Sequence, residues 1–269
     1  MAYKLIALDL DGTLTNERKE ITPRTREALM RAQRAGVRVV LASGRPVYGI
    51  APLAEELEIA RHGGFVLAIN GGRMVSWETR EVLFEQTLDP QLVPTLYHAA
   101  KDHGVEILTY QGEGIAATSV TDQYVLHEAF INKMPVMDYS DFLGKLVYPI
   151  NKCLIVGDPE RLAILEPELA HQMEGKMSVY RSAGFFLECV PLGIDKAASL
   201  QRLIDQLGIS REEVMACGDG WNDLSMIQFA GLGVAMANAA PELKECADFI
   251  TTSNEEDGVA LAVERFILS

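Results

Sequence analysis

Positive charge is scarce in this chain: 24 lysines and arginines stand against 38 aspartates and glutamates, which gives a formal net charge of -14. A protein this acidic repels phosphate backbones and anionic lipid headgroups, so we expect neither nucleic acid nor a membrane surface as its partner. The excess of carboxylates instead favours a protein that attracts divalent cations.

Long hydrophobic runs are also lacking. The longest are strand-sized, such as Val37–Ala42, which has one arginine inside it, and none approaches the ~20 residues of a membrane span. The N-terminal segment MAYKLIALDLDGT carries acidic residues within its apolar stretch and has no cleavage site, unlike a secretory signal. We therefore expect no membrane span and a cytoplasmic location.

Cysteine is rare and dispersed. The chain has four cysteines, none of them in a CxxC pair, and three lie within apolar runs. This pattern is typical of reduced, mostly buried thiols and argues against a disulfide framework or a zinc site. The four are Cys153, Cys189, Cys217 and Cys246.

The sequence has the length for two domains and the apolar content for a core. It has 269 residues, of which 48% are hydrophobic and 23% are charged, which excludes disorder as the main state. The first 70 residues alternate strand and helix patterns, an order that predicts a parallel sheet with right-handed crossovers. The expected elements are a strand at Lys4–Leu8, a helix at Arg24–Ala35, a strand at Arg38–Ala42, a helix at Tyr48–Leu57 and a strand at Phe65–Ile69.

The same alternation returns after about residue 190, whereas the stretch between mixes helices with separate strands. We therefore predict an α/β fold, a Rossmann-like parallel sheet built from residues 1–84 and 191–269, with an α+β domain inserted at 85–190. In the second half of the core we expect helices at Lys196–Leu207, from about Asp223, from Pro241 and at Gly258–Ile267, and strands at Val214–Cys217, Leu232–Ala235 and Phe249–Ile250. In the insert we expect helices at about Gln91–His103 and Glu160–Met173, and strands at Val105–Thr109, Cys153–Val156, Met177–Tyr180 and Phe185–Val190.

Two carboxylates, Asp9 and Asp11, directly follow the first predicted strand. Side chains two residues apart in an extended chain point the same way, and ligands of open parallel sheets bind at the carboxyl ends of strands. Gly12 allows the backbone to turn sharply there. The alternative is that both acids belong to an ordinary loop, but two carboxylates beside a hydrophobic strand are costly unless a cation or a proton offsets them.

Other expected strand ends carry matching groups. The second strand ends in Ser43-Gly44-Arg45, whose hydroxyl and backbone N–H groups suit a phosphate oxygen. The strand at Val214–Cys217 ends in GDGWND, which supplies two further carboxylates, Asp219 and Asp223. Aspartates around one point form the hard oxygen site that Mg²⁺ prefers. Lys196 opens a helix, where its charge opposes the helix dipole unless acids surround it.

In that order, DLDGT, SGR, a lysine and GDGWND resemble the four motifs of the haloacid dehalogenase-like hydrolases. The long insert before the lysine is similar to the cap domain, of the second type, in the Cof-type branch of that family. The resemblance continues through Asn70-Gly71, through FFLECVPLGIDKAASL and into the tail SNEEDGVALAVERFIL. It covers essentially the whole chain and is strongest to bacterial sugar-phosphate phosphatases.

The resemblance implies a phosphatase with an aspartyl-phosphate intermediate. Asp9 would attack phosphorus, and Asp11 would protonate the leaving oxygen and then deprotonate water, a division that requires Asp9 ionised and Asp11 protonated. Lys196 would offset the charge on Asp9. The implied phosphate-binding residues are Asp9, Leu10, Asp11, Ser43, Gly44, Lys196 and Asn222, and the implied Mg²⁺ ligands are Asp9, Asp11 through its carbonyl, Asp219 and Asp223.

The expected substrate is a small phosphorylated metabolite, with a sugar phosphate fitting best and flavin mononucleotide or pyridoxal phosphate left open. A homodimer is also left open. Polar and aromatic groups of the insert, together with two residues near the core site, are candidates to contact the substrate, although such side chains are more often packed groups with satisfied polar atoms. These candidates are Arg45, Asn70, Tyr124, His127, Lys152, Tyr180 and Arg181.

Two other functions use similar chemistry. A phosphomutase would form the same intermediate on Asp9 and pass the phosphoryl group to a sugar hydroxyl instead of water. A phospho-accepting signalling domain would present acids and a lysine on a parallel sheet, but it would be about half this length and would lack the DxDGT arrangement.

Overall fold

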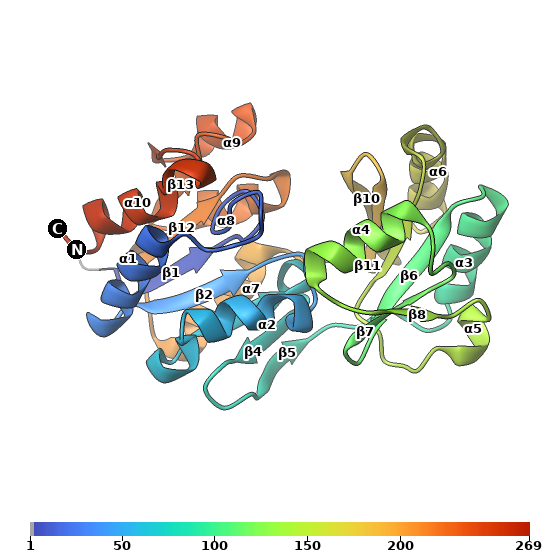
Figure 1. Cartoon of the computed structure of the whole chain (residues 1–269), viewed down its shortest axis with the longest axis horizontal. Coiled ribbons are helices and arrows are strands. Elements are labelled where there is room, and N and C mark those ends of the chain that lie inside the picture. The colour runs from blue at the N-terminus through green and yellow to red at the C-terminus, as the bar shows by residue number, and fades with distance from the viewer. Residues whose placement is uncertain (1–2) are drawn as a thin grey trace. The chain divides into compact units, whose positions relative to one another are not determined.

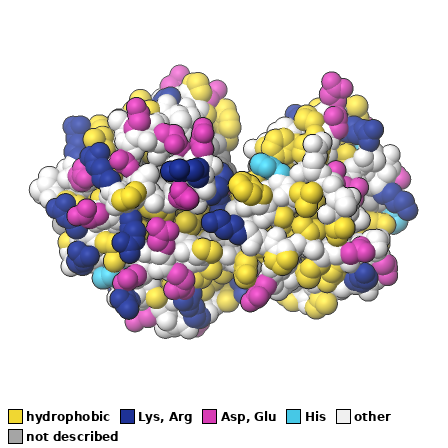
Figure 2. All heavy atoms as spheres, viewed as in Figure 1, with side chains coloured by type: hydrophobic (Ala, Val, Ile, Leu, Met, Phe, Trp, Pro, Cys, Tyr) yellow, Lys and Arg dark blue, Asp and Glu magenta, His cyan; other side chains and the backbone are white. Residues whose placement is uncertain are grey.

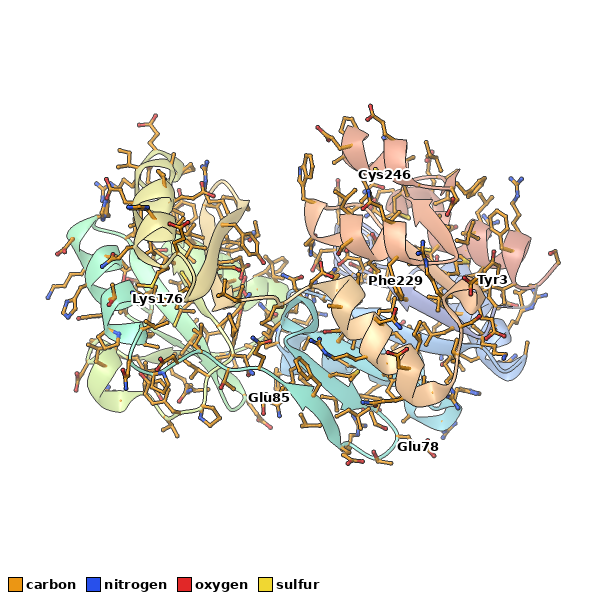
Figure 3. All side chains as sticks on the ribbon, turned by 180° about the vertical axis from the view of Figure 1, so that it is seen from behind. Tyr3, Glu78, Glu85, Lys176, Phe229 and Cys246 are labelled. Atoms are coloured by element: carbon orange, nitrogen blue, oxygen red, sulfur yellow. The ribbon has the colours of Figure 1, made fainter. Side chains whose placement is uncertain are left out.

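The computed structural model describes residues 3–269, which divide into two compact units. The first comprises the chain up to Phe84 together with Asp195–Ser269, and the second is Glu85–Ile194 (Figure 1). Glu85, the first residue of the second unit, is labelled in Figure 3. The chain re-enters the first unit at Asp195, four residues after the expected position 191.

The first unit is built on an eight-stranded sheet of order β14-β13-β12-β1-β2-β3-β4-β5. Its central strands pair in parallel and are almost fully buried, as expected for strands covered on both faces. The strands are β1 (Leu5–Leu8), β2 (Arg38–Ala42), β3 (Phe65–Ala68), β4 (Arg73–Ser76), β5 (Val82–Glu85), β12 (Val214–Gly218), β13 (Leu232–Ala235) and β14 (Phe249–Ile250).

Helices cover both faces of this sheet (Figures 1 and 3). Helix α1 packs against α10 on one face, and α7 packs against α8, which also contacts α9, on the other. The α-helices are α1 (Pro23–Arg34), α2 (Val47–Glu56), α7 (Lys196–Leu207), α8 (Leu224–Phe229), α9 (Pro241–Cys246) and α10 (Gly258–Phe266). The α/β fold predicted from the alternating pattern is confirmed.

The sheet differs from the prediction at one edge, where β4 pairs antiparallel with β3. The sequence predicted neither β4 nor β5, because each has only four residues and β5 lacks a buried residue that would reveal its alternation. Elsewhere local signals determine the boundaries. Thr22 caps α1 by accepting from the Thr25 N–H, with a proline at the first helical position.

The second unit contains a six-stranded sheet of order β10-β11-β9-β6-β7-β8. Ile107 and Ile155 pack with helices α3, α5 and α6, whereas their neighbours Leu108 and Leu154 pack with α4 on the opposite face, as the two-residue period of a strand requires. The strands are β6 (Glu106–Gln111), β7 (Gly114–Ala117), β8 (Val136–Asp138), β9 (Cys153–Val156), β10 (Met177–Ala183) and β11 (Phe186–Pro191). The helices are α3 (Val93–Asp102), α4 (Gln123–Asn132), α5 (Phe142–Lys145) and α6 (Pro159–Gln172).

The surface of the first unit carries charges of both signs, and the cysteines are unpaired. Acidic and basic side chains are interspersed over the visible face of the first unit (Figure 2). All four cysteines are free thiols; three are buried, and Cys246 is exposed on α9 (Figure 3). Among residues 3–269, no helix combines the length and the apolar character that crossing a membrane requires.

Candidate active site

Four neighbouring strands of the first unit, β12, β1, β2 and β3, bring the motif residues to one edge of the sheet. Asp9 and Asp11 follow β1, Ser43 follows β2, and Asp219 follows β12. These strands are parallel, so their carboxyl ends meet at the same edge, as the crevice rule for open α/β sheets predicts.

Lys196, at the first turn of α7, lies at the centre of this edge. Its Nζ donates to Oδ1 of Asp9 at 2.7 Å and to Oδ1 of Asp223 at 2.6 Å. All three side chains are buried. Burial acts to lower the pKa of Lys196, but the two carboxylates outweigh it and raise that pKa, so the ammonium is stabilised in its charged form.

Asp219 completes the acidic group and is positioned by the turn after β1. The Thr13 hydroxyl donates to its Oδ1 at 2.7 Å. Gly12 has a φ of +83°, and a Cβ there would overlap the Asp219 carboxylate. Two features therefore favour glycine at this position: the left-handed backbone conformation and the close approach of Asp219. Asn238, in the loop after β13, donates to the Gly12 carbonyl in the same turn at 2.8 Å.

The three carboxylates fit a divalent cation. Asp9, Asp219 and Asp223 each offer an oxygen within 4.8 Å of the others, and one lysine cannot neutralise three acids. Burial raises the pKa of Asp9 well above its usual value, with Asp223 adding to the effect. Burial likewise raises the pKa of Asp219 to about 6, against the hydrogen bond from Thr13. Such a cluster of hard oxygens with excess negative charge is the donor set that Mg²⁺ prefers.

Asp11 lies outside that cluster in this structure. Arg45 donates to it from Nε at 2.7 Å and from a terminal nitrogen at 2.5 Å, and Lys19 Nζ lies 2.6 Å from Oδ1. Burial acts to raise the pKa of Asp11, but Arg45 and Lys19 outweigh it and lower that pKa. This geometry favours the carboxylate, whereas the sequence led us to expect a protonated side chain. Arg45 is thus the partner of Asp11.

The phosphate-binding candidates form a second group beside the acids. Ser43 is buried, and its hydroxyl accepts from the Arg45 backbone N–H at 3.2 Å. Leu10 is fully buried between the two aspartates of the motif. A Cβ on Gly44 would lie 3.4 Å from the Asn70 amide, so these two residues are neighbours. Asn222 donates to Asn70 Oδ1 at 3.0 Å.

The predicted substrate contacts of the second unit all have partners within that unit or lie on its sheet. Lys152 is buried and pairs with Glu188 at 2.9 Å. Arg181 pairs with Glu166 at 2.6 Å. Tyr124 and His127 of α4 contact the Phe185 ring, with centroid distances of 5.5 Å in both cases. Tyr180 lies on β10.

Three contacts of the site were missed by the sequence analysis. Thr13 stands within DLDGT, so its place in the motif was the available signal. Lys19 reaches Asp11 from a loop position with a φ of +61°, which no local pattern predicts. Asn238 comes from the far end of the chain and is identified only by its hydrogen bond to Gly12.

A parallel α/β sheet with acids, a buried lysine and a serine at its strand ends defines a phosphoryl-transfer enzyme site. Over residues 6–263 the chain matches the model of the haloacid dehalogenase-like hydrolases. It belongs to that family, in the Cof-type branch, and is a phosphoric monoester hydrolase. The resemblance inferred from the four motifs is confirmed, and a non-enzymatic signalling domain is excluded.

Relatives of known structure or name support this membership. A haloacid dehalogenase-like hydrolase from Bacteroides thetaiotaomicron is 54% identical, with a TM-score of 0.95 over 98% of this chain and 99% of that one. The subclass IIB sugar phosphatase BT4131 is 25% identical, with a TM-score of 0.81 over 98% of both chains. In Bacillus subtilis (strain 168), the 5-amino-6-(5-phospho-D-ribitylamino)uracil phosphatase YcsE is 33% identical over 98% of this chain and 96% of its own.

Proposed function

We propose that the protein is a Mg²⁺-dependent phosphatase that hydrolyses small phosphomonoesters through an aspartyl phosphate on Asp9. The observation that carries this proposal is the placement of Lys196, whose ammonium lies within 2.7 Å of Asp9 and Asp223. A carboxylate repels a phosphate dianion, so it can attack phosphorus only where nearby positive charge offsets that repulsion. Lys196 provides this charge at the attacking group itself.

In the first half of the reaction, an Asp9 oxygen forms a bond to phosphorus and the ester oxygen leaves. Asp11 donates a proton to that oxygen, so the product is a neutral alcohol. The phosphoryl oxygens are bound by Ser43, by the N–H groups of Leu10 and Gly44, and by Asn222. For Asp11 to donate, it must exchange its contacts with Arg45 and Lys19, which favour the carboxylate, for a contact with the substrate.

In the second half, water attacks the phosphorus of the aspartyl phosphate. Asp11, now a carboxylate, accepts a proton from that water, and the bond between phosphorus and Asp9 breaks. Inorganic phosphate is released and both aspartates return to their starting states. Arg45 and Lys19 are suited to this half, because they stabilise the ionised form of Asp11.

Asp9, Asp219 and the Asp11 carbonyl would hold the metal, with Asp223 in support. When bound, Mg²⁺ supplies positive charge beside the phosphoryl oxygens. Both oxygens of Asp223 already accept hydrogen bonds, Oδ1 from Lys196 and Oδ2 from the backbone N–H groups of Asp219 and Gly220. We therefore assign Asp223 mainly to orienting Lys196 and the loop that carries Asp219.

We propose sugar phosphates as the substrate class, with the first unit as the catalytic core and the second as its cap. Two similarities support the substrate class: BT4131 is a sugar phosphatase, and YcsE acts on a phosphate carried by a ribityl chain. Polyol leaving groups are poor, so their departure needs the proton that Asp11 provides.

The test combines metal removal with chemical trapping. Wild-type protein, Asp9→Asn and Asp9→Ala are assayed for phosphate release from p-nitrophenyl phosphate and a panel of sugar phosphates, with Mg²⁺ and with EDTA. Borohydride reduction of the quenched wild-type reaction, followed by peptide mass spectrometry, locates the acyl phosphate. We expect activity only with Mg²⁺, no activity in either variant and modification at Asp9. An active Asp9→Ala enzyme would refute the nucleophile. Rearranged sugar phosphate without phosphate release would indicate a mutase.

A further inference from the structure

A turn of unusual backbone conformation follows β3. Ile69 has a φ of 54°, Asn70 of 53° and Gly71 of 94°, so three successive residues adopt left-handed conformations. Asparagine and glycine tolerate this region, but a β-branched residue such as isoleucine is an outlier there. Such strain persists where the surrounding contacts determine it, and it clusters at functional sites.

The backbone of this turn is bonded to the loop after β2. The Ile69 N–H donates to the Arg45 carbonyl at 3.0 Å, and the Asn70 N–H donates to the Ser43 carbonyl at 2.8 Å. These two bonds flank Gly44, where a Cβ would lie 3.4 Å from the Asn70 amide. The left-handed conformation thus holds the segment that carries Ser43 in a defined position.

The Asn70 side chain is bonded to the loop after β12. Its Oδ1 accepts from Asn222 Nδ2 at 3.0 Å, and 152 residues separate the two. Asn70 is 8% exposed whereas Asn222 is exposed, so this bond is partly buried. The bond orients the Asn222 side chain. Because Asn222 donates through Nδ2, its Oδ1 points away from Asn70.

The third residue of the turn packs against the start of α7. The Ser199 hydroxyl donates to the Gly71 carbonyl at 2.7 Å. A Cβ on Gly71 would lie 2.6 Å from Ser199 Oγ and 2.9 Å from the Asp195 carbonyl. The absence of a side chain therefore allows the first turn of α7, which begins with Lys196, to approach the turn closely.

We propose that Asn70 is a positioning residue for phosphoryl transfer: the strained turn Ile69–Gly71 aligns Ser43, Asn222 and Lys196, and Asn70 acts through Asn222 rather than on the substrate. The inference rests on the proposed roles of those three residues. It reassigns Asn70, which the sequence suggested as a substrate contact. The turn contacts the loop after β2, the loop after β12 and the first turn of α7, which are distant in sequence. Each of these segments carries one of the three residues, so the contacts of the strained turn align them.

The test is a double-mutant cycle between Asn70→Gly and Asn222→Ala. Glycine tolerates the conformation at residue 70, so Asn70→Gly removes the side chain and leaves the backbone unstrained. Lys133→Gly is the matched control, because Lys133 also has a left-handed conformation (φ 53°) but caps α4 in the second unit. The readouts are kcat/KM for p-nitrophenyl phosphate and the calorimetric Kd for inorganic phosphate with Mg²⁺.

We expect Asn70→Gly to lower kcat/KM and to weaken phosphate binding about 10-fold, the effect of losing one partly buried hydrogen bond. In the Asn222→Ala background the same change should have less than about a 2-fold effect, because its target is gone. Lys133→Gly should leave both readouts unchanged.

Equal losses in both backgrounds would overturn the proposal, since Asn70 would then act on the substrate or on the fold. So would a wild-type Kd in Asn70→Gly. The proposed nucleophile is tested separately by Asp9→Asn. If that variant retained activity, the cycle would still be readable, because it requires only phosphate release and phosphate binding.

Discussion

Oδ1 of Asp9 and Nζ of Lys196 lie 2.7 Å apart, although 187 residues separate them in the chain. Both are buried, and Asp223 is the second acid on the same ammonium. Removing one member of a buried ion pair leaves an uncompensated charge. The geometry therefore makes Lys196 important for stability as well as for reaction.

We predict that Lys196→Met abolishes phosphatase activity and lowers the free energy of unfolding by about 3–5 kcal/mol without metal. Added Mg²⁺ should recover part of the stability, because a cation offsets the same carboxylates. Urea denaturation with and without Mg²⁺ measures both effects. Lys176→Met is the control, since Lys176 is an exposed lysine of the second unit (Figure 3). Unchanged stability in Lys196→Met would contradict the prediction.

Gly12→Ala should damage the metal site through Asp219. The substitution combines a left-handed backbone with a Cβ that overlaps the Asp219 carboxylate. Gly36→Ala is a matched control, because Gly36 has a φ of +95° and nothing within 4 Å of its built Cβ. We expect both variants to lose stability, about 1 kcal/mol or more from the backbone. Only Gly12→Ala should raise the Mg²⁺ concentration for half-maximal activity, by at least about 10-fold. Equal requirements would refute the steric role.

The first strand and its acids could be predicted because the signal is local: a short apolar run, then Asp9 and Asp11, then a glycine. The pairing of Lys196 with Asp9 could not be obtained from spacing, since it depends on how α7 is placed beside β1; the family resemblance suggested it. Helix α4 was missed because its pattern is poorly amphipathic, with Leu126 and Phe130 exposed. The contact of Lys19 with Asp11 was missed because a left-handed residue turns the loop back.

A buried charged network in the second unit predicts a pH-dependent stability. Lys152 pairs with Glu188, and Glu128 lies near enough to contribute. Burial acts to lower the pKa of Lys152, but these acids outweigh it and raise that pKa above its usual 10.5. A base with a raised folded pKa contributes stability that is complete below the unfolded pKa and is lost as the pH rises through the folded value.

We therefore expect the wild-type free energy of unfolding to fall as the pH rises above about 10.5, the unfolded pKa of Lys152. Lys152→Met should cost about 3–5 kcal/mol at pH 7, because it leaves the buried Glu188 without its cation. The double variant with Glu188→Leu should recover most of that loss. Urea denaturation across this pH range checks each point. An equal alkaline decline in the double variant would show that other groups cause it.

Asp11→Asn should separate the two halves of the reaction by the quality of the leaving group. p-Nitrophenolate departs without a proton, whereas a sugar alkoxide does not, so only the sugar phosphate needs Asp11 in the first half. With p-nitrophenyl phosphate we expect a burst of about one nitrophenolate per protein and then slow turnover, since the aspartyl phosphate forms but water is no longer activated. With a sugar phosphate we expect no burst and a rate lowered by about 10²–10⁴-fold.

Stopped-flow absorbance and quenched phosphate assays measure these rates. Arg24→Ala is the control, because Arg24 is exposed and its ion-pair partners, Glu264 and Asp257, have no role in the proposed reaction. A burst of equal size with both substrates would show that Asp11 does not protonate the leaving group. In the wild-type protein, Arg45 and Lys19 would then keep Asp11 ionised throughout the reaction.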